Sequence, residues 1–262
     1  MLSIDDNDEL QNRDISGTFI KGMSVLKSFD DSQATLTLAR IAGITGLDRA
    51  VVRRLVLTLV HLGYVKKSGR NFSLTHRVLV LAGGFLRGNQ FGIHIQPILN
   101  KYAAHLGSAI SLAMLDGDIA VYVAQSTLTN SPISFGFTIG SRLPLLHTAI
   151  GRMLLAFADP DLASSLVETS DFDARTTLAI IDRSVIREKI IEVRQQEYAI
   201  VDGEFEEGVM AFAVPIGTAG DLKAVLGVSE PQSAVKSRRE QTRYINVLQD
   251  CARELSSAGV LG

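Results

Sequence analysis

The sequence predicts an α+β protein of two domains, an N-terminal winged helix-turn-helix and a C-terminal α/β domain with a mainly antiparallel sheet. Near the N-terminus, three helical patterns are followed by a basic hairpin, which is the element order of a winged helix-turn-helix. Beyond them, two apolar hairpins are interspersed with amphipathic helices, as in a layered α/β domain. We expect a disordered tail over residues 1–17, the first domain over 18–75, a linker helix over 76–92 and the second domain over 93–262.

Composition places the chain among soluble globular proteins, because 46% of its 262 residues are hydrophobic and 21% are charged. Cys251 is the one cysteine, so the chain can form no internal disulfide and no thiol-based zinc site. The start "MLSIDDNDELQNRDISG" lacks the positive charge and apolar core of a signal peptide, and no apolar run approaches membrane-spanning length. We therefore expect a cytoplasmic protein without a membrane partner, a metal or a cofactor.

The net charge of −2 hides an uneven distribution. Residues 40–90 contain nine Lys and Arg against one acid, Asp48, which gives this block a net charge of +8. Residues 1–39 contain three basic against seven acidic residues, and residues 91–262 contain 14 against 20. A basic block in an acidic chain indicates a segment that binds a polyanion. A solvated surface with clustered charges is the alternative.

The first domain is predicted from its helix signals. An apolar helical stripe begins at Phe19, and the Asp30-Asp31-Ser32 cluster ends it. Two more helices follow over residues 38–45 and 49–62, joined by the short turn "GLD". The expected caps and stops are, in chain order, Thr37, Gly46, Asp48 and Gly63. In "YVKKSGRNFSLT", two short strands flank a basic turn, "KKSGRN", and a helix over residues 76–89 then leads to the second domain.

The second domain is predicted to combine hairpins with flanking helices. The Asp116-Gly117 turn joins two apolar strands, and "TAGD" joins "GVMAFAVPIG" to "LKAVLGVSEP". These last strands are almost continuously apolar, so we expect their sheet to be covered on both faces. We expect a third strand at "PISFGFTIG". Helices are expected to end near Leu106, to span "HTAIGRMLLAFA", to begin at Pro160, and to cover residues 183–197 and 233–256. Such a domain suits a ligand sensor of the GAF or PAS kind.

Four stretches carry a family resemblance. "LTLARIAGITGLDRAVVRRLVLTLVHLGYV" resembles the DNA-binding segment of IclR-type transcriptional regulators. In the second domain, "IGSRLPLLHTAIGRMLLAF", "RQQEYAIVDGEFEEGVMAFAVPI" and "AVLGVSEP" resemble that family's effector-domain signatures, in the family's order. The resemblance covers nearly the whole chain from about Thr18. Within the family, the paired arginines before "LVLTLVHLGYV" and the "VDGEFEEG" segment look most like the subgroup that controls protocatechuate, 4-hydroxybenzoate and β-ketoadipate catabolism.

The resemblance implies a regulator that binds double-stranded operator DNA and responds to a small aromatic or dicarboxylic acid. It implies a GAF-like effector-binding domain for residues 93–262. It also implies a homodimer formed through the N-terminal domains and, often, a dimer of dimers formed through the effector domains.

The basic helix supplies the expected DNA contacts. Arg49 and Ala50 lie at its N-terminal end and Arg53 lies one turn further on the same face, where a recognition helix makes base contacts. Either arginine can bind guanine in bidentate fashion, and Ala50 can contact a thymine methyl. Arg54 is rotated by about 100° from Arg53, so we expect it at a phosphate. The other expected phosphate or groove contacts are Thr37, Lys66, Lys67 and Arg70. A solvated position is the alternative for each.

By resemblance, an effector pocket lies between the sheet and the loop before Gly151. The expected lining residues are His147, Ala149, Ile150, Val201, Asp202, Val209, Ala211, Gly227 and Ser229. The N-terminus of the following helix offers backbone N–H groups to a carboxylate. The alternatives are a structural His147 bonded to backbone, a Ser229 hydroxyl satisfied within its strand, and an Asp202 that caps a turn.

An enzyme and a ligand-independent architectural DNA-binding protein are the competing interpretations. The five histidines show no metal-ligand spacing, and no G-x-S-x-G, P-loop or G-x-G-x-x-G stretch occurs. The carboxylates of "DGEFEEG" could serve acid–base chemistry, but a polar loop before a buried strand is the simpler interpretation. The sequence therefore predicts no catalytic residue, and the α/β domain argues against an architectural protein.

Overall fold

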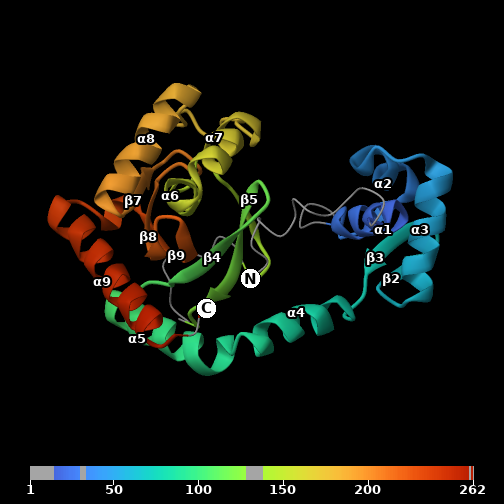
Figure 1. Ribbon diagram of the computed structural model, residues 1–262, viewed down its shortest axis with the longest axis horizontal. Helices are drawn as coiled ribbons and strands as arrows, with labels where there is room; N and C mark the ends of the chain where they lie inside the picture. The colour runs from blue at the N-terminus through green and yellow to red at the C-terminus, as the bar shows by residue number, and fades with distance from the viewer. Residues whose placement is uncertain (1–14, 30–33, 128–137, 260, 262) are drawn as a thin grey trace. The chain divides into compact units, whose positions relative to one another are not determined.

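The computed structural model describes residues 15–29, 34–127, 138–259 and 261 (Figure 1). The chain divides into two compact units, residues 1–88 and 89–262. Most of the expected tail, residues 1–14, and the Asp30-Asp31-Ser32 stop signal lie outside the described residues. The expected domain limits at 75/76 and 92/93 remain predictions.

The first unit has the expected order of helices followed by a hairpin. Its elements are α1 (Gly17–Lys27), β1 (Leu36–Thr37), α2 (Leu38–Thr45), α3 (Arg49–His61), β2 (Val65–Ser68), β3 (Asn71–Leu74) and α4 (Val78–Gly88). The strands form an antiparallel sheet in the order β1-β3-β2. The prediction of a winged helix-turn-helix is confirmed. The two-residue strand β1 was not expected from the sequence.

Side-chain caps set the boundaries of α2 and α3. The hydroxyl of Thr37 accepts a hydrogen bond from the amide of Arg40 at 3.3 Å, and the Asp48 carboxylate accepts one from the amide of Ala50 at 2.7 Å. Between the two helices, Gly46 adopts a φ of 66°, a left-handed conformation that costs glycine little. These contacts confirm the expected caps and hold the turn between the helices to three residues.

The wing is longer in its strands and tighter in its turn than the sequence indicated. Lys66 and Lys67 belong to β2 and not to the turn, which consists of Gly69 and Arg70 alone. Gly69 has a φ of 60°, as a two-residue hairpin turn requires. The basic turn expected over "KKSGRN" is therefore corrected, because the ladder continues to the pair Ser68–Asn71.

The second unit combines a six-stranded sheet with helices on both faces. Its elements are η3 (Phe91–Ile95), α5 (Gln96–Leu106), β4 (Ser111–Asp116), β5 (Ile119–Gln125), β6 (Arg142–Pro144), α6 (Ala149–Phe157), α7 (Pro160–Thr169), α8 (Arg183–Gln196), β7 (Ala199–Asp202), β8 (Val209–Thr218), β9 (Asp221–Pro231), η4 (Gln232–Ala234) and α9 (Arg238–Ser257). The strand order is β6-β5-β4-β9-β8-β7, and every pair is antiparallel. This confirms the predicted mainly antiparallel sheet.

Helices cover the long central strands on both faces, as their continuous apolar character predicted. The buried helix α6 packs against β8 and β9, and α8 packs against α6 (Figure 1). On the other face α9 packs against the same two strands, with α5 beside it. Strands that are buried on both faces need apolar side chains in both directions.

The second unit differs from the expectation at two strands and at the start of its last helix. The expected third strand covers residues 132–140, of which 132–137 lie outside the described residues and 138–140 are not strand; the strand is β6, which begins at Arg142. Strand β7 has no counterpart in the sequence prediction. Helix α9 begins at Arg238 and not at Ser233, because the Ser237 hydroxyl caps it.

A buried ion pair joins α6 to the loop between β7 and β8. The Arg152 guanidinium donates to both carboxylate oxygens of Glu204, at 2.7 and 2.5 Å, and its Nε donates to the carbonyl of Leu146 at 2.9 Å. Only 3% of the Arg152 side chain and 10% of the Glu204 side chain are exposed. One guanidinium therefore holds together α6, the chain before α6 and the loop after β7.

The chain before α6 also packs directly on the helix backbone at Gly151. A Cβ placed there would lie 2.2 Å from the carbonyl oxygen of Leu145 and 2.4 Å from its Cα. Since these are backbone atoms, no side chain at this position can be accommodated by a rotamer change. Glycine at residue 151 thus permits the close packing that the Arg152 hydrogen bonds maintain.

Removing one partner of the Arg152–Glu204 pair should destabilise the second unit strongly. Arg152→Met leaves the buried Glu204 carboxylate without a counter-charge, so we expect a loss of about 3–5 kcal/mol in the free energy of unfolding, measured by urea denaturation. The double variant Arg152→Met/Glu204→Met should recover much of this loss, because it buries no charge. The control Lys189→Met breaks the exposed Lys189–Glu192 pair and should cost about 0–1 kcal/mol. Equal small losses of unfolding free energy in Arg152→Met and Lys189→Met would contradict the structural role of the Arg152–Glu204 pair.

Candidate functional site

Helix α3 has one buried and one basic face. Val52, Leu55, Val56 and Leu59 are buried in the core of the first unit. The exposed residues near the N-terminal end include those expected to contact DNA: Arg49, Ala50, Arg53 and Arg54. Among the described residues, none of these three guanidinium groups forms an ion pair, whereas arginines of the second unit such as Arg152 do. The arginines of α3 are thus available to an external anion.

The residues of the wing do not share one face. Lys67 pairs with the buried Phe72 and Lys66 pairs with Ser73. Because side chains alternate along a strand, Lys66 projects from the face opposite to Lys67. Arg70 is exposed in the turn. Lys66 and Lys67 therefore point to different sides of the wing, although they are adjacent in sequence.

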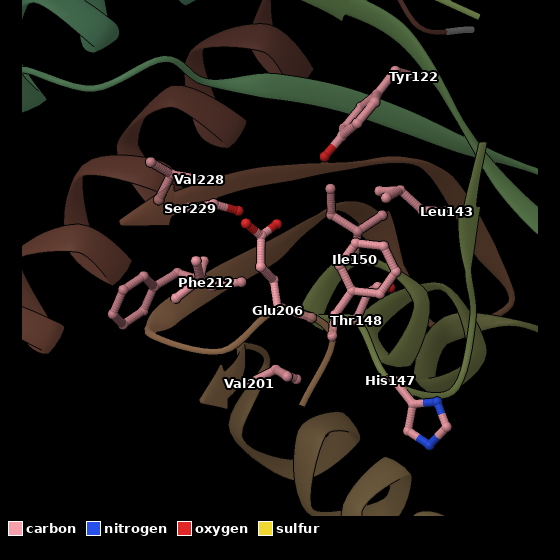
Figure 2. A pocket seen from close by; sticks show the side chains of 14 residues that line it. Tyr122, Leu143, His147, Thr148, Ile150, Val201, Glu206, Phe212, Val228 and Ser229 are labelled. Atoms are coloured by element: carbon pink, nitrogen blue, oxygen red, sulfur yellow. The ribbon is translucent and has the colours of Figure 1, made fainter. Parts of the chain in front are cut away.

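The second unit contains a cavity of about 50 Å³ between the start of α6 and strands β7, β8 and β9 (Figure 2). Its lining residues are Tyr122, Leu143, His147, Thr148, Ala149, Ile150, Val201, Phe205, Glu206, Val209, Ala211, Phe212, Val228 and Ser229. Seven of the nine expected residues are among them; Asp202 and Gly227 are not. That these residues bind an effector remains a prediction.

The two exceptions have simple geometric reasons. Asp202 is exposed and accepts a hydrogen bond from the Gln232 side chain, because it follows Val201 in β7 and so faces the other side of the strand. Gly227 presents no side chain, and a Cβ built on it would lie 2.6 Å from Cδ1 of Ile150. Ile150 thus occupies the space above Gly227, and Figure 2 shows its side chain in the middle of the pocket.

His147 lies at the edge of the pocket, but its ring is already engaged. Its Nε2 lies 2.9 Å from the carbonyl oxygen of Ile180, and the ring stacks on Phe172 at a centroid distance of 5.2 Å. In Figure 2 the imidazole points away from the other labelled side chains. These contacts favour the structural interpretation of His147 over a direct role in ligand binding.

Seven lining residues were not predicted from the sequence; four of them lie in strands and depend on the sheet register. The seven are Tyr122, Leu143, Thr148, Phe205, Glu206, Phe212 and Val228. Burial raises the pKa of the Tyr122 hydroxyl to about 12, so this group stays protonated at neutral pH. The position of Thr148 before the apolar run of α6 was a signal for a helix cap, and so for a residue beside the helix N-terminus.

The start of α6 provides hydrogen-bond donors to the pocket. The Thr148 hydroxyl caps the amide of Gly151 at 3.0 Å and donates to the carbonyl of Pro144 at 2.7 Å. The amides of Ala149 and Ile150 lie in the first turn, where a helix has no internal acceptor for them. Since both residues line the cavity, their amides and the positive end of the helix dipole can receive a carboxylate.

The described part of the chain contains neither a candidate metal site nor a candidate membrane-spanning helix. Across residues 15–29, 34–127, 138–259 and 261, no group of three or more His, Cys, Asp and Glu side chains is arranged to hold a metal ion. In the same residues, no helix combines the length and apolar character needed to cross a bilayer.

Comparison with known families matches both units in order. Residues 19–69 match the IclR helix-turn-helix domain, and residues 88–257 match the bacterial transcriptional regulator IclR C-terminal domain. These two matches coincide with the unit that carries the basic helix and the unit that contains the cavity.

Full-length relatives and a solved structure agree with these matches. The Pca regulon regulatory protein of Pseudomonas putida is 34% identical over 243 residues, which are 92% of this chain and 84% of the relative. The p-hydroxybenzoate hydroxylase transcriptional activator of Acinetobacter baylyi is 30% identical over 95% of this chain and 94% of its own length. The fold is shared with an IclR homolog from Microbacterium hydrocarbonoxydans complexed with 4-hydroxybenzoate, with a TM-score of 0.72, 20% identity, and coverage of 92% of this chain and 98% of that one. The chain belongs to the IclR family of bacterial transcriptional regulators.

Proposed function

We propose that this regulator binds a specific operator through α3 and the wing, in the cytoplasm, and that a small aromatic or dicarboxylic acid in the pocket of the second unit alters its DNA affinity. Two features of the chain support this proposal: a basic face of α3 whose arginines form no ion pair with the described residues, and a cavity beside a helix N-terminus. We assign it no catalytic role. The regulator would control genes for the breakdown of that acid, as the names of the relatives suggest.

At the DNA, α3 would enter the major groove with its N-terminal end. Arg49 and Arg53 lie four residues apart on the exposed face, so both can reach base edges, with Ala50 beside them for a thymine methyl. Arg54 and the Thr37 hydroxyl would contact phosphates. The remaining phosphate or minor-groove contacts are assigned to Lys66, Lys67 and Arg70, of which Lys66 and Lys67 face different sides.

Substitution of Arg53 should reduce sequence preference, whereas substitution of Arg54 should not. Arg53→Ala is expected to cost about 1–3 kcal/mol on operator DNA and to relax the preference at one base pair. Arg54→Ala is expected to weaken binding to operator and random DNA alike. It should also reduce the slope of log affinity against log salt concentration by the amount of about one phosphate contact. Fluorescence-anisotropy titrations at several salt concentrations measure both. If Arg53→Ala weakens both DNAs equally, the assignment of Arg53 to a base is wrong.

At the pocket, a carboxylate would bind the first-turn amides of α6 and the rest of the ligand would contact the apolar lining. An engineered cavity that accepts benzene measures roughly 150 Å³, about three times the present volume of about 50 Å³. A ring would therefore require side chains to move, and Ile150 occupies the centre of the pocket (Figure 2). Ligand binding is thus coupled to a change at the start of α6.

Filling the pocket should abolish effector binding without unfolding the protein. Ala211→Leu adds a larger side chain to a half-buried lining position, so we expect at least a tenfold loss of affinity, on the order of 1.4 kcal/mol, in calorimetric titrations. The ligands are 4-hydroxybenzoate, protocatechuate and β-ketoadipate. Ala104→Leu, at an exposed site of α5, is the matched control and should bind as the wild type does. No binding of any of the three acids by the wild type at millimolar concentration would sink the proposed ligand class.

The first unit also supports a homodimer. Helix α4 has no buried residue, and its Leu79, Val80 and Leu81 are 67%, 65% and 57% exposed. In α1, Phe19 and Ile20 are 69% and 54% exposed. Apolar surface of this extent on a soluble protein marks an interaction site. We propose that a second copy covers it, and that the second units can join two such dimers.

A charge placed on α4 should break this dimer. Leu81→Glu would require burial of a carboxylate in an apolar interface. We therefore expect sedimentation velocity to show more monomer, with a dissociation constant of the dimer that is at least about tenfold higher. Leu62→Glu, at an exposed leucine after α3, serves as control and should leave the distribution unchanged. An unaltered distribution for Leu81→Glu would place the interface elsewhere.

A further inference from the structure

The three glutamates between β7 and β8 have different surroundings. Glu204 is buried and paired with Arg152. The Glu207 carboxylate accepts a hydrogen bond from the Thr177 hydroxyl at 3.4 Å. Glu206 is exposed to solvent, its side chain lines the cavity, and it has no hydrogen-bond or ion-pair partner among the described residues. Of the three, Glu206 is therefore the one whose carboxylate is open to a ligand.

Figure 2 shows where this carboxylate lies. It extends from the loop into the pocket, toward Ser229 and beside Ile150. Gly203 and Gly208, with φ of 71° and 78°, bracket the loop and turn it back over the pocket. The described lining contains no Lys or Arg, so no cationic lining side chain neutralises Glu206.

An unneutralised carboxylate in the pocket discriminates between ligands. A ligand that displaces water from Glu206 must replace the lost hydrogen bonds, or the group's desolvation opposes binding. A hydroxyl group on the ligand can donate such a bond to the charged acceptor. A second carboxylate on the ligand can only accept, and its charge repels Glu206.

We propose that Glu206 selects a monocarboxylic acid that also carries a hydroxyl group, and that it disfavours dicarboxylic acids. The amides of Ala149 and Ile150 receive the ligand's one carboxylate, and Glu206, assisted by Ser229, accepts from its hydroxyl. This inference rests on the proposed function, in which the pocket binds a small organic acid. It narrows that ligand class to a hydroxy acid and names the residue responsible.

The test is a calorimetric comparison of three probes that differ in one substituent. They are 4-hydroxybenzoate, benzoate, which lacks the hydroxyl, and terephthalate, which has a carboxylate in its place. The full-length wild type should bind 4-hydroxybenzoate about tenfold or more tightly than benzoate, and terephthalate most weakly, since a hydrogen bond to a charged group contributes at least that factor. 3-Hydroxybenzoate, added as a fourth probe, reports on the position of the hydroxyl.

Two variants assign the discrimination to Glu206. Glu206→Gln keeps the size of the side chain and removes the charge, so the preference for 4-hydroxybenzoate over benzoate should shrink and terephthalate should bind more tightly. Glu207→Gln, with its carboxylate outside the pocket lining, is the matched control and should keep the wild-type ratios. If the wild type binds these acids but Glu206→Gln leaves all ratios unchanged, the role of Glu206 is refuted while the pocket remains the effector site. If the wild type binds none of the probes, this inference fails, whereas binding of β-ketoadipate by the same protein would leave the proposed function standing.

Discussion

The pocket depends on one buried ion pair. Arg152 joins α6 to Glu204 and to the carbonyl of Leu146, so it fixes the distance between the start of the helix and the loop over the sheet. Burying two charges is costly unless both are satisfied. Here the carboxylate accepts two hydrogen bonds from the guanidinium and one from the amide of Ile180, and the guanidinium also donates to a backbone carbonyl. The same loop then positions Glu206 at the cavity. The ion-paired Glu204 and Glu206, the residue proposed to select the ligand, are thus two residues apart in one segment.

In each unit, a helix N-terminus is both a structural boundary and a proposed binding surface. In α3, Asp48 caps the first turn and Arg49 follows it at once on the exposed side. In α6, Thr148 caps the amide of Gly151, and the two residues before Gly151, Ala149 and Ile150, line the cavity. First-turn amides and the helix dipole favour anions, which suits a phosphate at one site and a carboxylate at the other. In both cases a short polar side chain sets the end of the helix, and the residues next to it are assigned to the ligand.

Local signals in the sequence were sufficient for the helices of the first unit, but not for the extent of its strands or for the pocket. Caps and stops such as Thr37, Asp48 and Gly46 act within a few residues, so the sequence showed them directly. Seven lining residues were transferred from a family resemblance, but Asp202 was misplaced because one step along β7 reverses the face of the strand. Tyr122 and Glu206 were missed because they reach the cavity through the pairing of β4 with β5 and through a loop packed by Arg152. Such positions follow from long-range register, which periodicity does not encode.

The central claim is that effector binding occurs at the cavity beside α6. Hydrogen exchange of the full-length protein, followed by mass spectrometry with and without saturating 4-hydroxybenzoate, tests it most directly. We expect the ligand to slow exchange mainly in peptides that cover residues 143–151 and 201–211, with smaller changes across the rest of the second unit. Protection confined to other segments, such as the groove between α5 and α9 near His105 and Arg243, would contradict it.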